Sequence, residues 1–149
     1  MDNMSQKIVP CLWFDGVARE AVDFYVDAFD CAPGFEGSVA AAQRYPEQGL
    51  PETQKDHAGD EMMIEFDLAG VRFAALNAGP EFSFIPANSL MVNFGPSHDA
   101  FAREQQCGWC RDRFGVSWQI IPENLQDLLA KPGAFENLMS MTKIVIADL

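Results

Sequence analysis

The side chains best suited to chemistry gather in residues 107–122. This stretch predicts two short strands joined by a turn at 112–115, because an aspartate opens the turn and a glycine closes it. Side chains alternate between the two faces of a strand, so Trp118 projects from one face and Gln119 from the other. An amide side chain such as that of Gln119 is unusual in a strand that is otherwise so apolar. Gln119 therefore either lines a cavity or faces solvent.

The same stretch begins with Cys107-x-x-Cys110, a spacing found in redox and zinc sites. A thioredoxin-type pair lies where a helix begins, whereas this pair lies on a predicted strand, where a separation of three directs the thiols to opposite faces. A structural zinc ion would need two further ligands, and the only histidines are His57 and His98. We therefore predict neither redox nor metal chemistry at this pair. The four cysteines also do not form the framework of a disulfide-rich protein.

Composition limits the function classes. The 149 residues fit one domain, residues 1–149, and 48% hydrophobic with 21% charged residues is ordinary for a globular protein. No apolar run reaches the roughly 20 residues of a membrane span, and the N-terminus has no secretory signal pattern, so we expect a cytoplasmic protein with no membrane partner. The net charge is −12 and no basic stripe occurs, which argues against nucleic acid. The acidity serves solubility or favours a cationic ligand.

Hydrophobic periodicity predicts the elements of the first half of the chain. Residues 7–14 are an apolar strand, and Asp15 is the expected N-cap of a helix that ends at Pro33-Gly34. A weaker strand covers 35–45, and 46–60 form a loop in which His57 is solvated rather than catalytic. A hairpin follows, with strands at 61–68 and 71–77. The buried stripe of the helix and the core face of the hairpin are predicted to comprise Ala18, Ala21, Val22, Tyr25, Ala28 and Phe29, and Met62, Ile64, Phe66 and Leu68.

The second half begins with an aromatic-rich loop at 78–88, which either packs into the core or covers a pocket. A strand at 89–94 is followed by a short helix that Ser97 could cap, and then by the hairpin of 107–122. Two short amphipathic helices end the pattern, one around Leu125, Leu128 and Leu129 and the other around Phe135, Leu138 and Met139. The apolar tail 144–147 is expected to dock on the sheet or on a second subunit.

Four stretches resemble one known group: LWFDG at 12–16, EAVDFY at 20–25, FAALNAGPEF at 73–82 and DRFGVSWQIIP at 112–122. They resemble the vicinal oxygen chelate (glyoxalase/bleomycin-resistance) superfamily, and within it the PhnB-like group, often labelled a 3-demethylubiquinone-9 3-methyltransferase domain. The resemblance covers most of the chain from Lys7 onward. It implies an α+β fold in which paired βαβββ modules form a curled mixed sheet around a cup-shaped pocket. It also implies a homodimer.

The two modules differ in length. The first spans residues 7–77, the second only 89–122, and residues 123–149 form C-terminal helices and a tail. Where relatives carry a longer helix and another strand, this chain has only 101–106. Either the second module is shortened, which would expose a sheet edge, or a segment between Asp99 and Cys107 is missing. The second alternative is favoured.

Metal-dependent relatives hold a divalent ion through His or Glu side chains on four strands. Carried over one position at a time, the resemblance puts these ligands on or near Pro10 and on Asn77, Ser89 and Gln119. None of them is an imidazole or a carboxylate, the groups that such ions prefer. We therefore predict no metal and no other cofactor. A glyoxalase-type or dioxygenase-type reaction, which depends on Lewis acidity, is not expected.

A pocket lined by amides, a hydroxyl and aromatic rings remains. Its predicted residues are Trp13, Asn77, Phe82, Ser89, Trp109, Trp118 and Gln119. Such a lining suits an uncharged or cationic organic ligand, held by stacking and a few hydrogen bonds. The tryptophans could instead belong to the core.

The leading hypothesis is a metal-free, PhnB-like small-molecule binding protein, with a sequestering role as in bleomycin-resistance relatives. One alternative is an enzyme of unknown reaction that uses Gln119, Asn77 or a cysteine thiol. Another is a metal enzyme in which His57 or His98 supplies a ligand. Methyl transfer has no support, because no glycine-rich loop connects a strand to a helix and the chain lacks the alternating β/α order of a doubly wound sheet.

Overall fold

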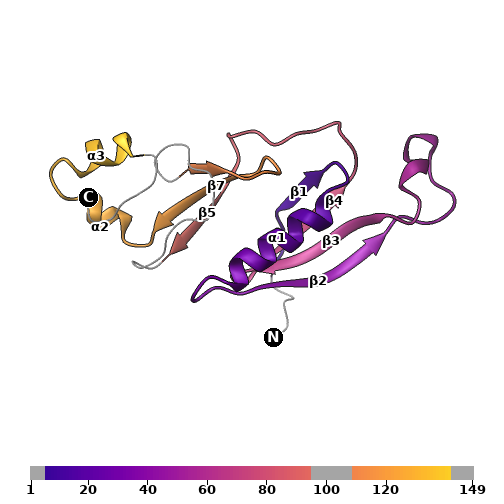
Figure 1. Cartoon of the computed structure of the whole chain (residues 1–149), viewed down its shortest axis with the longest axis horizontal. Coiled ribbons are helices and arrows are strands. Elements are labelled where there is room, and N and C mark those ends of the chain that lie inside the picture. Colours follow the sequence, from indigo (N-terminus) through magenta and orange to yellow (C-terminus); the bar gives the residue numbers. More distant parts are fainter. Residues whose placement is uncertain (1–5, 95–108, 142–149) are drawn as a thin grey trace. The chain divides into compact units, whose positions relative to one another are not determined.

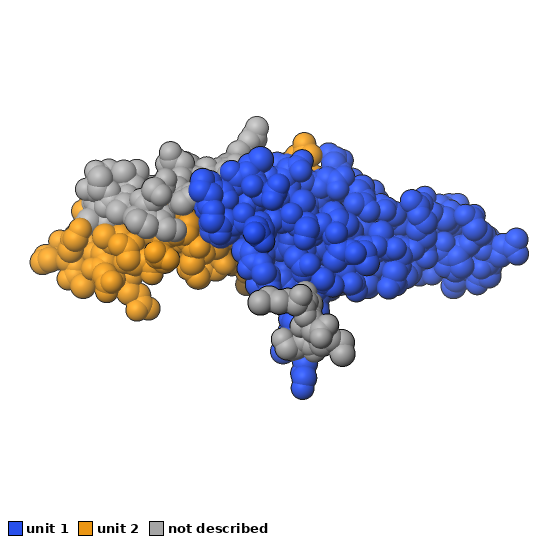
Figure 2. Space-filling view, turned by 90° about the horizontal axis from the view of Figure 1, so that it is seen from below, with its two compact units in different colours: residues 1–83 blue, residues 84–149 orange. Residues whose placement is uncertain are grey.

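The computed structural model describes residues 6–94 and 109–141 of the chain (Figure 1). The chain divides into two compact units, residues 1–83 and 84–149 (Figure 2). The predicted modules 7–77 and 89–122 fall one in each unit, and the single-domain expectation stays a prediction. Several expectations lie outside the described residues: the helix capped by Ser97, His98, Cys107, the segment between Asp99 and Cys107, and the tail 144–147.

The first unit contains a four-stranded sheet with the strand order β1-β4-β3-β2. Strand β1 is parallel to β4, and the other two pairings are antiparallel. Its elements follow the predicted order of strand, helix and three strands: β1 (Cys11–Phe14), α1 (Ala18–Asp30), β2 (Gly37–Arg44), β3 (Glu61–Leu68) and β4 (Val71–Asn77). The predicted hairpin is confirmed with the same bounds. Ala69 and Gly70 both have positive φ, as a tight two-residue hairpin turn requires.

Helix α1 covers one face of this sheet, and Figure 1 shows it lying across the strands. Tyr25 of α1 stacks on Phe66 of β3, with ring centroids 6.4 Å apart, and Phe66 stacks on Phe73 of β4 at 5.5 Å. The buried side chains of the unit's core include Leu12, Phe14, Ala18, Ala21, Val22, Tyr25, Ile64, Phe66, Leu68, Phe73 and Ala75. The predicted stripe of α1 is therefore correct in its first two turns, while Ala28 and Phe29 are only half-buried.

The predicted N-cap of α1 is wrong. The helix begins at Ala18, so the N-cap position is Val17, whose side chain makes no capping hydrogen bond. The Ala18 amide donates instead to Asn77 Oδ1 at 2.9 Å, from the end of β4. A side chain distant in sequence thus satisfies a helix N-H that a local cap normally satisfies.

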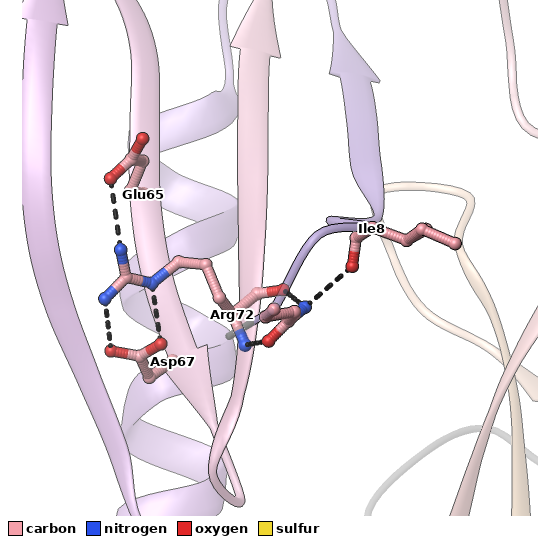
Figure 3. A network of polar contacts seen from close by, with 5 residues as sticks. Ile8, Glu65, Asp67 and Arg72 are labelled. Atoms are coloured by element: carbon pink, nitrogen blue, oxygen red, sulfur yellow. Dashed lines mark hydrogen bonds and ion pairs between the residues drawn. The ribbon is translucent and has the colours of Figure 1, made fainter. Parts of the chain in front are cut away.

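The other face of the same sheet carries a charged cluster (Figure 3). Arg72 Nε and Nη2 donate to the two Asp67 oxygens at 2.7 and 3.0 Å, and Arg72 Nη1 donates to Glu65 Oε2 at 3.1 Å. The Gln6 amide pairs with the main chain of Arg72, accepting from its N-H and donating to its C=O at 2.8 Å each. Strand β4 therefore gains a ladder-like partner from a side chain as well as from β1.

The second unit contains a three-stranded sheet with the order β5-β7-β6, in which β5 and β7 are parallel and β6 and β7 antiparallel. Its elements are β5 (Ser89–Phe94), β6 (Trp109–Arg111), β7 (Ser117–Pro122), α2 (Leu125–Leu129) and α3 (Ala134–Ser140). Ile121 of β7 packs with Leu128 of α2 and with Ala134 and Leu138 of α3. The strand at 89–94, the hairpin and the two short helices are confirmed. No helix within 6–94 or 109–141 has the length and apolar character needed to cross a bilayer.

Close packing between α1 and β2 yields a prediction. A Cβ added at Gly37 would lie 2.5 Å from the main-chain oxygen of Val26 and 2.9 Å from its Cα. Backbone atoms cannot move aside as a flexible side chain can, so Gly37→Ala should lower the free energy of unfolding by about 1–3 kcal/mol. Urea denaturation measures this. Ser38→Ala, at the neighbouring exposed position, is the control and should change stability by less than about 0.5 kcal/mol. Equal stability of the two variants would contradict the close approach.

Candidate functional site

The seven predicted ligand residues divide between the two units. Asn77, Trp13 and Phe82 belong to the first unit, while Ser89, Trp109, Trp118 and Gln119 belong to the second. No finding here tests whether these residues bind a ligand, so their role stays a prediction. Their positions within each unit can nevertheless be stated, and they separate the seven into residues on open faces and residues held inside the fold.

Three residues of the second unit share one sheet face. Gln119 of β7 is the direct cross-strand partner of Trp109 on β6. On the opposite side, Gln119 Nε2 donates to the Oγ of Ser89 on β5 at 2.8 Å. All three side chains are half-buried, so solvent reaches them. The structure thus brings together an amide, a hydroxyl and an indole on neighbouring strands.

Trp118 lies on the opposite face of β7. It is 7% exposed, and its Nε1 donates to Asp112 Oδ2 at 2.9 Å. The other oxygen of Asp112 accepts from the main-chain N-H groups of Phe114 and Val116 at 2.8 and 3.0 Å. Trp118 therefore anchors the hairpin turn from inside the unit. Alternation predicted that Trp118 and Gln119 would face opposite ways, and the register of β7 confirms it.

Two aromatic residues of the first unit come together on the sheet face opposite α1. Trp13 of β1 pairs in register with Leu76 of β4, whereas its neighbours Leu12 and Phe14 are buried on the helix side. Trp13 Nε1 donates to the C=O of Gly79 at 2.8 Å. The ring of Phe82 meets the indole edge-to-face, with centroids 4.8 Å apart. Phe82 is 67% exposed, so this part of the aromatic-rich loop does not pack into the core.

Asn77 lies on the helix-covered face of the first sheet and is 9% exposed. Its Oδ1 accepts from Ala18 N at 2.9 Å, and its Nδ2 donates to the C=O of Glu61 at 3.0 Å. Its own C=O accepts from the Tyr45 hydroxyl at 2.8 Å. Both ends of the amide thus have protein partners, on the face opposite Trp13. Period-two alternation with buried Phe73 and Ala75 was the sequence signal for this placement.

An ion pair adjoins Asn77. Arg19 donates twice to the Glu61 carboxylate, at 2.6 Å through Nη2 and 3.0 Å through Nε, and more weakly to Asp23 at 3.4 Å. The hydrogen bond from Arg19 is the main reason why the pKa of Glu61 is lowered, and the bond to Glu61 is the main reason why the pKa of Arg19 is raised; partial burial opposes both shifts. Helical spacing of four indicates the Asp23 pair, whereas no local pattern indicates Glu61, which is 42 positions away.

The residues at the four expected metal-ligand positions do not fit a metal ion. Pro10 has no side-chain donor atom, the Asn77 amide is bonded at both ends, and Gln119 Nε2 is bonded to Ser89. Within 6–94 and 109–141, no three His, Cys, Asp or Glu side chains cluster in a way that could hold a metal. His57 stacks on Tyr45 with ring centroids 5.4 Å apart. The metal-free expectation stays a prediction.

The hydrogen bonds of Asn77 predict a large stability loss on truncation. Asn77→Ala leaves the Ala18 N-H and the Glu61 C=O without their partner, and each unsatisfied buried group costs about 1–3 kcal/mol. We expect the free energy of unfolding to fall by about 2–4 kcal/mol, measured by urea denaturation. Asn93→Ala removes an exposed asparagine from β5 and is the control. A loss below about 0.5 kcal/mol for Asn77→Ala would show that the amide does not cap α1.

The lowered pKa of Glu61 predicts a pH dependence of stability. A carboxyl with a lower pKa in the folded state stabilises the fold above its unfolded pKa, and this contribution is lost as the pH falls through the folded value. Stability should therefore decrease as the pH falls below about 4.5, the ordinary glutamate range. Glu61→Gln should lose stability at pH 7 and show a flatter acid limb in thermal melts at pH 2.5–7. An unchanged acid limb would exclude a contribution from the Arg19–Glu61 pair.

Comparison with known proteins identifies the family. Residues 6–121 match the family described as 3-demethylubiquinone-9 3-methyltransferase. A solved structure of a PhnB protein from Bacillus cereus, described as a candidate 3-demethylubiquinone-9 3-methyltransferase, is 28% identical, with a TM-score of 0.60 over 78% of this chain and 99% of that chain. A Staphylococcus aureus protein is 21% identical over 78% of this chain and 97% of its own, but its TM-score of 0.35 is too low to bear on the fold. No curated protein sequence matches the chain. With 116 of its 149 residues inside the family match and a fold shared with a PhnB structure, this chain belongs to the PhnB-like 3-demethylubiquinone-9 3-methyltransferase family.

Proposed function

We propose that this PhnB-like chain binds a small organic molecule without a metal ion, and that Gln119, Ser89 and Trp109 contact it. The observation that carries the proposal is the Gln119–Ser89 hydrogen bond of 2.8 Å on an open sheet face. A polar pair on two neighbouring strands rich in apolar residues needs a binding partner or solvent to satisfy its remaining groups. Trp109, directly opposite Gln119, adds a flat apolar surface.

The hydrogen-bonding capacity of this pair suggests what it recognises. The Gln119 amide has two donors and one carbonyl, and the Ser89 hydroxyl both donates and accepts. One amide end and the hydroxyl are used on each other, and this leaves at least one donor and one acceptor outside that hydrogen bond whichever way the amide is turned. A ligand with an adjacent donor and acceptor, such as a carboxamide or an alcohol, would complement them.

The other predicted residues enter this proposal in two ways. Trp13 and Phe82 offer a second aromatic surface on the first unit, because Phe82 is 67% exposed. Asn77 and Trp118 act indirectly, since their polar groups already have protein partners that hold α1 and the hairpin turn. We further propose that the protein is a cytoplasmic homodimer, as the sequence and the resemblance imply. Analytical ultracentrifugation would test the dimer.

Methyl transfer is not part of the proposed function, although the family description names it. A methyl-donor site normally uses a glycine-rich loop between a strand and a helix, whose free N-H groups approach the cofactor. Among the described residues of the first unit, the one connection from a strand to an α-helix runs from β1 to α1 and contains one glycine, Gly16. The first N-H of α1 is already bonded to Asn77 Oδ1. These features support binding rather than methyl transfer.

A thermal-shift screen tests the proposal. Small molecules that carry a donor–acceptor pair are screened for an increase in Tm of the unmodified chain, because a ligand that binds only the folded state stabilises it. Gln119→Ala and Ser89→Ala should each abolish most of the increase, since truncating one hydrogen-bonding partner weakens binding by about fivefold or more. Asn93→Ala, at an exposed position of the same strand as Ser89, should leave it unchanged.

Ligands that stabilise all three variants as well as the parent would overturn the assignment of this site. A stoichiometric Zn, Mn, Ni or Fe content in the purified protein, determined by elemental analysis, would overturn the metal-free part. If a metal is present and Gln119→Ala retains it, the ligand set lies elsewhere in the chain.

A further inference from the structure

A second surface of the molecule has the chemistry of a cation site. Its aromatic part is the pair Trp13 and Phe82 on the first unit, with ring centroids 4.8 Å apart at an interplanar angle of 77°. The hydrogen bond from Trp13 Nε1 to the Gly79 C=O holds the indole in place and uses the only polar group of the indole. Most of the Phe82 ring remains open to solvent. An exposed aromatic ring attracts a cation placed over its face.

A carboxylate lies on the same short loop. Glu81 Oε2 lies only 2.6 Å from the point where a Cβ of Gly79 would be, so the carboxylate packs directly on the main chain of Gly79. Gly79 has φ +107°, a conformation that side-chain-bearing residues rarely adopt. The same glycine therefore accepts the Trp13 N-H and makes room for Glu81. No described residue donates a hydrogen bond to this carboxylate.

The charge of the chain concentrates on this unit. Residues 1–83 contain 5 basic and 15 acidic residues, a net charge of −10, whereas residues 84–149 contain 5 basic and 7 acidic residues, a net charge of −2. Arg72, a cation on the sheet face that carries Trp13, is neutralised by Asp67 and Glu65. A negative potential over the unit attracts cations and opposes anions.

We infer that Trp13, Phe82 and Glu81 form a subsite for an organic cation, such as a quaternary or substituted ammonium group. The rings supply cation–π attraction, which is strongest for weakly hydrated cations, and the carboxylate supplies the opposite charge. The inference rests on the proposed binding function and adds a ligand class to it, with residues that differ from Gln119 and Ser89.

The test uses a matched pair of probes on the full chain. Choline and its uncharged isostere 3,3-dimethylbutan-1-ol have nearly the same shape and differ in charge. Titration is followed through the indole N-H signals of the three tryptophans in 15N-resolved NMR spectra, with Trp13→Phe to assign the Trp13 signal. Choline should shift the Trp13 signal and bind about two- to fivefold more tightly than the isostere, the ratio that a solvent-exposed cation–π contact gives. Added salt should weaken choline binding alone.

Variants locate the subsite. Phe82→Ala and Glu81→Gln should each weaken choline binding by about threefold or more. Phe135→Ala, which removes a phenylalanine of similar exposure (61%) from the other unit, and Glu36→Gln, an exposed glutamate of the first unit, should have no effect. Equal binding of the two probes would overturn the cation preference while leaving the proposed binding function intact. No shift of the Trp13 signal by either probe would overturn the subsite, whatever the outcome of the Gln119→Ala screen.

Discussion

The Asn77 amide is the interaction on which the first unit depends. It lies at the end of β4, it donates to the C=O of Glu61 at the start of β3, and it accepts the first N-H of α1. One side chain thus ties a helix to two strands and replaces a local N-cap. Because buried polar groups are costly when unpaired, any displacement of α1 would leave several groups without partners at once. This constraint commits one face of the sheet to the helix and leaves the other face for Trp13 and Arg72.

In the second unit too, one face of the sheet carries a structural hydrogen-bond network and the other face carries the candidate ligand residues. Asp112 accepts from two main-chain N-H groups of the hairpin turn and from the Trp118 indole, so a half-buried cluster centred on a carboxylate fixes the turn from one face. Strand alternation then directs Gln119 to the other face, toward Ser89 and beside Trp109. In both units, a hydrogen-bonded anchor on one face of a hairpin strand determines which side chains the other face can offer to a ligand. The candidate binding surfaces are consequences of these anchors.

These surfaces bear on the function of the PhnB-like family. Ser89 and Gln119 present neutral hydrogen-bonding groups, which suit recognition of an organic molecule better than Lewis-acid chemistry. The first unit has a net charge of −10 and presents aromatic rings beside a carboxylate. The family description as a methyltransferase finds no counterpart in the described strand-to-helix connections.

The sequence by itself determined the elements and the facing of their side chains. Period-two and helical periodicities predicted the hairpin of 61–68 and 71–77, the strand 89–94 and the opposite directions of Trp118 and Gln119, because such patterns depend only on near neighbours. The α+β fold class was predicted from the resemblance to the PhnB-like group. Tertiary structure alone decided the partners: Asn77 meets Ala18 across 59 positions, Arg19 meets Glu61 across 42, and Trp13 meets Gly79 across 66. These contacts follow from sheet register and the docking of α1, which no local pattern encodes. For that reason the sequence could name Trp13, Asn77 and Gln119 as polar or aromatic residues of interest, and only the fold separated the anchor from the residues on open faces.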